Sequence, residues 1–264
     1  MLQTALVTGA SAGLGRELVR QLVRDRGATV LATARRPDRL EALAAEMPAG
    51  RVEVLAGDLA DPEFRDRLWA RAEAFPGGLD LLVNNAGRGH YAAFAEEDPA
   101  IVRRIVEVNL MALLDLTRRG VRHMKARGSG QVLQISSALG FVGIPYSATY
   151  VATKHAVNGL VKSLRYELRG TGVRVWAACP NRIESEFHAV SLGRSGEPMR
   201  SPYSEPAERM ARRILRGLDR RGAFLLPGAS SWAVVRAAHW LPVPFEWFMQ
   251  RWASGHFRRE MGGD

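Results

Sequence analysis

Short apolar segments alternate along the chain with longer segments in which apolar residues recur every three or four positions. The short segments are typical of strands buried on both faces, and the long ones of amphipathic helices that cover a sheet. The predicted strands lie at 4–10, 28–34, 51–58, 79–87, 130–136, 172–180 and 222–228, and the predicted helices at 13–25, 37–46, 62–74, 99–126, 150–169 and 206–220.

Strict alternation of strand and helix predicts an α/β fold. We expect a Rossmann-type, doubly wound parallel sheet of about seven strands between two layers of helices. The polar segment 190–205 is rich in turn-forming residues and is predicted to be a loop. One domain over 1–229 is expected, followed by a C-terminal extension over 230–264 of different character.

Composition agrees with a globular protein that has a full core, since 47% of the 264 residues are hydrophobic and 24% are charged. A single cysteine, Cys179, excludes an internal disulfide. The segment MLQTALVTGA leads directly into a strand-like run, with no signal-peptide pattern, and no apolar run reaches membrane-spanning length. We therefore expect a cytoplasmic protein, at most peripheral to a membrane.

The formal net charge is +10, and only three of the 37 basic residues are lysines. Such an excess favours anionic partners such as nucleotides, acidic lipids or nucleic acid. No nucleic-acid-binding module is visible, so no nucleic acid partner is expected. Because lysine is scarce, Lys154, one helical turn after Tyr150, is a candidate functional cation rather than an incidental surface charge. The six histidines show no metal-ligand spacing, so no metal is expected.

The first predicted strand ends in the glycine-rich stretch TGASAGLG, at 8–15. Glycines at this turn let the backbone N–H groups approach a pyrophosphate, which then faces the helix N-terminus. The stretch therefore predicts a dinucleotide site. Its expected cofactor contacts are Gly9, Ser11, Gly13, Leu14 and Gly15.

The end of the second predicted strand indicates which dinucleotide binds. A protein that binds NAD usually carries an acidic residue there, for the ribose 2′-hydroxyl. Here Ala34 is followed by Arg35 and Arg36, which would pair with a 2′-phosphate. We expect NADP(H) as cofactor. The alternative, two solvated arginines at a helix start, is less favourable because cations destabilise helix N-termini.

Five motifs together resemble the single-domain branch of the short-chain dehydrogenase/reductase family, in its order and spacing. They span roughly 4–228 and comprise TGASAGLG at 8–15, NNAG at 84–87, Asn109, ISS at 135–137, and the pair Tyr150 and Lys154. The resemblance implies a catalytic tetrad of Asn109, Ser137, Tyr150 and Lys154. Ser137 is preferred to Ser136 because it lies 13 residues before Tyr150, the usual interval in the family.

The resemblance also gives the tetrad its chemistry. Tyr150 would donate a proton to a carbonyl oxygen in reduction and accept one in oxidation, and Ser137 would hold that oxygen. We expect the Lys154 ammonium to lower the phenol pKa from its usual value near 10. In the family, the residue matching Lys154 also holds the nicotinamide ribose, and the residue matching Asn109 supports a relay water.

Further cofactor contacts follow from the same resemblance. Arg35 would contact the 2′-phosphate, and Asp58 with Asn85 or Ala86 would line the adenosine side. Arg36, Leu59, Gly87, Tyr150, Lys154, Pro180, Ile183 and Ser185 complete the expected set. The chain departs from the family at Asn181, where glycine is usual, and at Ser185, where threonine is usual. Asn181 would have to tolerate a positive φ there.

These features predict an NADPH-dependent carbonyl reductase, reversible to an alcohol dehydrogenase, for a small-molecule apolar ketone or secondary alcohol. The alternative is a non-catalytic dinucleotide-binding regulator on the same fold. Family members commonly form homodimers or homotetramers through the helices matching 99–126 and 150–169, and we expect the same here. His90, in the loop after NNAG, is a candidate for lining the substrate entrance.

The C-terminal extension carries four of the six tryptophans, at 232, 240, 247 and 252, interleaved with arginines. Pro242 and Pro244 predict a break between two short helices. Tryptophan and arginine on such helices suit a membrane interface. They equally suit a cap over the substrate cleft or an oligomer contact, which we favour because each helix is short for binding lipid on its own.

Overall fold

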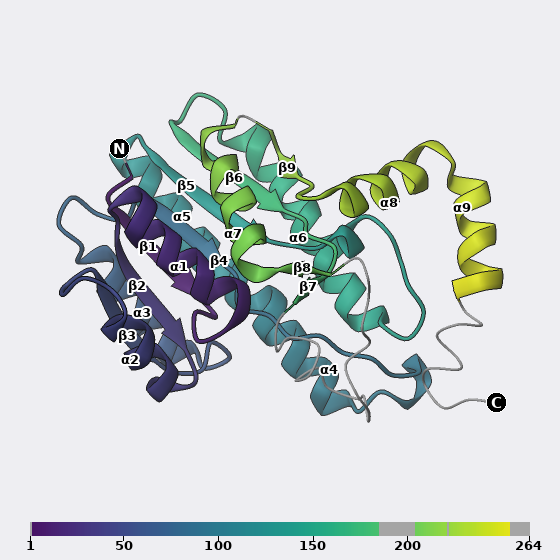
Figure 1. The fold of residues 1–264 in the computed structure, drawn as a ribbon, viewed down its shortest axis with the longest axis horizontal. Coiled ribbons are helices and arrows are strands. Elements are labelled where there is room, and N and C mark those ends of the chain that lie inside the picture. The colour runs from purple at the N-terminus through teal and green to yellow at the C-terminus, as the bar shows by residue number, and fades with distance from the viewer. Residues whose placement is uncertain (1, 185–203, 221, 254–264) are drawn as a thin grey trace.

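The computed structural model describes residues 2–184, 204–220 and 222–253. Seven parallel strands form one sheet in the order β3-β2-β1-β4-β5-β6-β9 (Figure 1). Their bounds are Thr4–Thr8 (β1), Thr29–Ala34 (β2), Val52–Ala56 (β3), Leu81–Asn84 (β4), Gly130–Ile135 (β5), Val173–Ala178 (β6) and Phe224–Leu225 (β9). The predicted doubly wound α/β sheet is confirmed.

Helices cover both faces of this sheet. One face packs against α1 (Gly13–Arg26), α2 (Pro37–Ala45) and α7 (Ala207–Leu215), and the other against α3 (Pro62–Glu73), α5 (Ala112–Arg127) and α6 (Ala148–Glu167). Side chains alternate between the two faces along each strand, so Val7 joins the first core and Leu6 the second. Both faces are buried, which explains why the strands lack polar alternation.

The predicted helix over 99–126 has an interruption that the apolar pattern does not reveal. It consists of α4 (Pro99–Val106), a π-helical turn η2 (Glu107–Met111) and α5. The backbone stays helical on both sides of η2, so the three parts form one continuous helix. Such π turns inside α-helices occur often at functional sites, because they re-aim one side chain.

Other departures are small. The last strand is shorter than predicted, and Ile183–Glu184 (β7) pairs with Glu205–Pro206 (β8) in a separate two-stranded sheet that was not predicted. The prolines break the C-terminal segment as expected, into α8 (Ala229–Trp240) and α9 (Pro242–Phe248), which continues into the π-helical turn η5 (Met249–Ala253). Within the described ranges, no helix combines the length and apolarity needed to cross a bilayer.

Candidate active site

A cavity of about 360 Å³ opens at the carboxyl ends of the strands, beside the point where the strand order reverses between β1 and β4. Open α/β sheets bind ligands at this position, because the connections leave in opposite directions there. The cavity is lined by the predicted residues Gly9, Ser11, Gly13, Leu14, Gly15, Arg35, Arg36, Asp58, Leu59, Asn85, Ala86, Gly87, Ser137, Tyr150, Lys154, Pro180 and Ile183. Ser185 lies outside the described residues.

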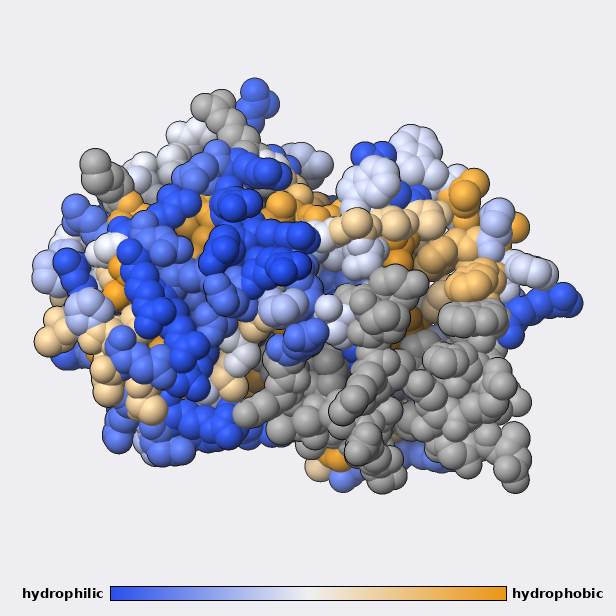
Figure 2. Space-filling view, viewed as in Figure 1, coloured by the Kyte–Doolittle hydropathy of each residue, from blue (hydrophilic) through white to orange (hydrophobic). Residues whose placement is uncertain are grey.

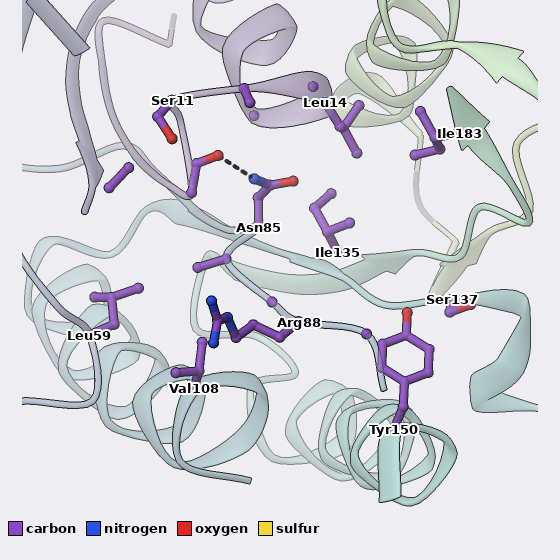
Figure 3. Close-up of a pocket in the computed structure, with 18 of the residues that line it drawn as sticks. Ser11, Leu14, Leu59, Asn85, Arg88, Val108, Ile135, Ser137, Tyr150 and Ile183 are labelled. Atoms are coloured by element: carbon purple, nitrogen blue, oxygen red, sulfur yellow. Dashed lines mark hydrogen bonds between the residues drawn. The ribbon is translucent and has the colours of Figure 1, made fainter. Parts of the chain in front are cut away.

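The glycine-rich loop leaves no room for side chains. Gly9 has a φ of +68°, and a Cβ atom there would lie 2.9 Å from the Ala86 Cα. A Cβ atom at Gly15 would lie 2.2 Å from the Gly9 carbonyl oxygen. The Asn85 amide clamps the loop to the end of β4, since its Nδ2 donates to the carbonyl oxygens of Thr8 and Gly9 over 2.9 and 3.2 Å (Figure 3). Glycine at these positions therefore lets the loop pack closely against the end of β4 and the start of α1, with its backbone at the cavity wall.

Tyr150 and Ser137 meet at the other end of the cavity, where Figure 3 shows the phenol pointing at the serine. Tyr150 lies in the first turn of α6, and Ser137 caps the short helix η3 (Ala138–Gly140) after β5. Their side chains are hydrogen-bonded. Ser136 is engaged elsewhere, because its hydroxyl donates to the Asn158 Oδ1 over 2.7 Å. The geometry therefore favours Ser137 as the partner of the phenol.

Burial controls the protonation of this pair. It raises the pKa of Tyr150, a nearby Tyr91 raises it further, and the hydrogen bond to Ser137 lowers it only in part. Lys154 does not lower the pKa of the Tyr150 phenol in this arrangement. Its Nζ donates to the Ile135 carbonyl oxygen over 2.9 Å and lies 5.6 Å from the Tyr150 ring centroid. The phenol therefore holds its proton at neutral pH, as a general acid must.

Lys154 is buried one turn further along α6. Desolvation lowers its pKa to about 8. An amine with that pKa is about nine-tenths protonated at pH 7, so the site keeps a cation near the phenol.

Asn109 is placed by the π turn η2 and is buried. Its amide forms both possible bonds to the Arg88 backbone, since Oδ1 accepts from the Arg88 N over 2.8 Å and Nδ2 donates to the Arg88 carbonyl oxygen over 2.9 Å. Asn109 thus fixes the loop after β4 against the long helix. Gly87 lies beside both residues, since a Cβ atom there would be 3.5 Å from Asn109 Oδ1 and 3.8 Å from Lys154 Nζ.

The opposite end of the cavity is strongly basic. Four arginines line it: Arg35, Arg36, Arg88 and Arg104. The guanidinium of Arg36 donates to the Ser11 hydroxyl over 3.2 Å, which ties the end of β2 to the glycine loop. Burial and the neighbouring Arg35 and Arg104 charges lower the pKa of Arg88. Such mutual repulsion is relieved when an anion binds between the cations.

Asp58 is the one acidic residue among the cavity-lining residues that the structure describes. Arg104 pairs with it, and the Ala60 N donates to it over 3.0 Å. Burial opposes its ionisation, but these bonds and the Arg104 and Arg35 charges lower the pKa of Asp58. The negative charge of Asp58 is therefore paired with Arg104.

Sequence reasoning missed several cavity-lining residues, and the three with polar side chains that bear most on the chemistry are Arg88, Tyr91 and Arg104. Arg88 follows NNAG directly, and its position after a motif at a strand end was a usable signal. Figure 3 shows its side chain extending toward Leu59, away from Tyr150. Arg104 comes from α4, and nothing in the local pattern distinguishes it from Arg103.

Tyr91 is held in place from both sides. The Ser147 hydroxyl donates to the His90 carbonyl oxygen over 3.0 Å, and the Ala92 N donates to the Tyr146 carbonyl oxygen over 3.0 Å. These bonds tie the loop after β4 to the residues just before α6. Tyr91 consequently lines the cavity from a fixed position near the phenol of Tyr150.

His90 does not line the cavity. It is buried, with its Nε2 3.5 Å from a Glu97 carboxylate oxygen, and so packs within its loop. Asn181 does line the cavity. Its φ is not positive, since Tyr146 is the one non-glycine residue with a positive φ in the described part of the chain. An L-residue is therefore accommodated at this position without the positive φ that the family resemblance led us to expect.

Comparisons with known proteins agree with this geometry. The family model for short chain dehydrogenases matches residues 3–192. An uncharacterized oxidoreductase of Myxococcus xanthus is 37% identical over 218 residues, which are 81% of this chain and 85% of that protein.

Solved structures resemble the fold as well. A Sphingobium yanoikuyae short-chain dehydrogenase in complex with NADPH is 28% identical, with a TM-score of 0.79 over 92% of this chain and 96% of that one. A Burkholderia phymatum short chain dehydrogenase/reductase in complex with NAD has a TM-score of 0.81 over 90% of this chain and 92% of that one, but at 21% identity it shows the fold alone. The chain belongs to the short-chain dehydrogenase/reductase family of oxidoreductases.

Proposed function

We propose that the chain is an NADP(H)-dependent carbonyl reductase, reversible to an alcohol dehydrogenase, that acts on an apolar ketone or secondary alcohol. The observation that carries the proposal is a single cavity with two chemically different ends. Tyr150, Ser137 and Lys154 lie at one end, and a glycine loop with four arginines lies at the other.

The residues present fit a dinucleotide phosphate. The closely packed glycine loop brings its backbone to the cavity wall at the start of α1, and the arginines offer countercharge without an acidic residue at the end of β2. Gly9, Gly13 and Gly15 would hold the pyrophosphate, and Arg35 and Arg36 the 2′-phosphate. When bound, the nicotinamide supplies or accepts the hydride.

The chain's own residues would transfer the proton to and from the substrate oxygen. Ser137 would donate a hydrogen bond to the substrate carbonyl oxygen and hold it near the phenol of Tyr150. Tyr150 would then give its proton to that oxygen as the alcohol forms, and take it back in the reverse reaction. The Lys154 ammonium would stabilise the phenolate left behind. Asn109 would hold the loop at Arg88 against the long helix through its two bonds to the Arg88 backbone.

The apolar substrate class is supported by the walls of the cavity near Ser137. Figure 3 shows Ile135 and Ile183 on the same side as Ser137 and Tyr150, and Leu139 and Tyr91 line the same cavity. Purified protein would be mixed with NADPH or NADH and a panel of aldehydes and ketones, with turnover followed by nicotinamide absorbance. We expect NADPH to be preferred and apolar ketones to be the better substrates.

Arg35→Ala should weaken the binding of NADPH more than the binding of NADH. Only NADPH carries the 2′-phosphate, and a charge-assisted bond to it is expected to contribute about tenfold or more in affinity. Fluorescence titration with each cofactor measures the two dissociation constants. Arg24→Ala, an exposed arginine outside the cavity, is the matched control and should change neither constant. An equal loss for both cofactors in Arg35→Ala would reject the assignment of Arg35.

We further propose a homodimer or homotetramer, since the long helix formed by α4, η2 and α5 and the helix α6 are those expected to pair. Their outer sides retain exposed apolar residues, such as Met111 on η2. Light scattering at micromolar concentration measures the assembly directly, and a monomer there would reject the proposal.

A further inference from the structure

Residues 229–253 form two helices that project from the body of the fold (Figure 1). α8 follows the short strand β9 and packs on η3, while α9 contacts α8 at the bend that joins them (Figure 1). The first turn of α8 is fixed, because Ser231 is fully buried and its hydroxyl donates to the Pro227 carbonyl oxygen over 3.2 Å. In the part of the chain that the structure describes, no residue of 229–253 lines the cavity. The expected cap over the cleft therefore gains no support.

The projecting helices expose large apolar side chains. The bend between them presents Trp240, Leu241 and Val243, which are 67%, 57% and 77% exposed, and Trp232 and Trp247 are more than half exposed on either side. These five residues are called the tail patch. Figure 2 shows pale and orange residues gathered over α8 and α9, whereas blue residues dominate the opposite end of the molecule. Exposed apolar groups clustered in this way mark an interaction site.

The charges within this segment are mostly positive. Residues 229–253 contain two arginines and a single acidic residue, Glu246. Both arginines stack on tryptophans of the tail patch, since the Arg236 guanidinium lies 5.0 Å from the Trp232 ring and that of Arg251 lies 5.2 Å from the Trp247 ring. Burying the Trp232 or Trp247 ring in an apolar environment would therefore also bury the arginine that stacks on it.

This pairing distinguishes between possible partners. An apolar protein surface that covered the rings would also desolvate the arginines, and a second copy of the segment could offer only its own Glu246 in compensation. At the surface of a bilayer, the rings sit at headgroup level while the guanidinium groups bind lipid phosphates. The net charge of +10 adds long-range attraction to an acidic surface.

We propose that the tail patch is a docking surface for an anionic lipid membrane, on which α8 and α9 lie in the interfacial layer without crossing it. Each helix is short, but the bend joins them, so that their apolar residues enter the interface together. This inference is independent of the proposed catalytic activity. It reverses our preference for a cap or an oligomer contact.

Sedimentation of the full-length protein with vesicles tests the proposal. We expect binding to vesicles that contain phosphatidylglycerol and little binding to pure phosphatidylcholine. The double variant Trp240→Ala with Trp247→Ala should bind about tenfold more weakly, because two interfacial side chains are lost. Both positions are largely exposed, so the fold should not depend on them. Tyr166→Ala is the matched control: Tyr166 is 82% exposed in the last turn of α6, away from the patch, and its loss should leave binding unchanged.

Intrinsic fluorescence gives a second readout. Trp69 and Trp176 are buried in the core, so a blue shift on addition of anionic vesicles reports on the tryptophans of the C-terminal segment. Absence of binding, or equal binding by the double variant and the wild type, would overturn the proposal. So would an oligomer that dissociates in the double variant while the wild type ignores vesicles, because the patch would then be a contact between copies.

Discussion

Tyr150→Phe is expected to lower kcat by about 10²–10⁴-fold while NADPH still binds. The substitution removes only the hydroxyl that is hydrogen-bonded to Ser137, and the ring keeps its place in the first turn of α6. The proton donor is lost, but the glycine loop and the arginine end of the cavity are untouched. Steady-state kinetics with the best panel ketone and a fluorescence titration with NADPH separate the two effects.

Two matched variants control for this change. Tyr166→Phe alters an exposed phenol on the same helix and should leave kcat unchanged. Tyr91→Phe alters the second phenol of the cavity and should retain most of the turnover, since it leaves the Tyr150 hydroxyl in place. Tyr150→Phe retaining more than about a tenth of the wild-type kcat would contradict its role as general acid.

Lys154→Met should lose both turnover and cofactor affinity. Methionine occupies a similar volume but cannot stabilise a phenolate or donate a hydrogen bond. We expect kcat to fall about 10²-fold or more, with weaker NADPH binding. Lys162→Met, an exposed lysine on the same helix, is the control and should behave like the wild type.

The same variant tests a pH dependence. Because burial lowers the pKa of Lys154 to about 8, its charge is present below that pH and is lost as the pH rises through it. Wild-type affinity for NADPH should therefore fall across this window, and Lys154→Met should lack that part of the pH dependence. Unchanged kcat and unchanged NADPH affinity in Lys154→Met would contradict the proposed role.

The sheet was predictable from sequence because its strands are buried on both faces and read as short apolar runs. The glycine loop and the Tyr150–Lys154 spacing were predictable for a similar reason, since each belongs to one local element. The π turn at Asn109 was not, because apolar residues spaced three or four positions apart do not show where a single extra residue enters the helix. The ladder between Ile183–Glu184 and Glu205–Pro206 is too short to leave a pattern.

The pKa of the Tyr150 phenol and the clustering of arginines at one end of the cavity could be found only from the folded structure. The lysine near Tyr150 suggested a lowered phenol pKa, but in the folded protein burial raises that pKa and the Lys154 amine donates to the Ile135 carbonyl oxygen instead. The basic end of the cavity assembles Arg35, Arg88 and Arg104 from three separate segments, and sequence spacing gives no measure of their proximity.

Transfer of deuterium from cofactor to substrate tests the central claim most directly. NADPH deuterated at its hydride position would be incubated with the best panel ketone, and the alcohol examined by mass spectrometry. The account predicts deuterium on the carbinol carbon with wild-type protein and very little product with Tyr150→Phe. Tight NADPH binding with no deuterated alcohol from any panel carbonyl would contradict it and favour a non-catalytic dinucleotide-binding regulator.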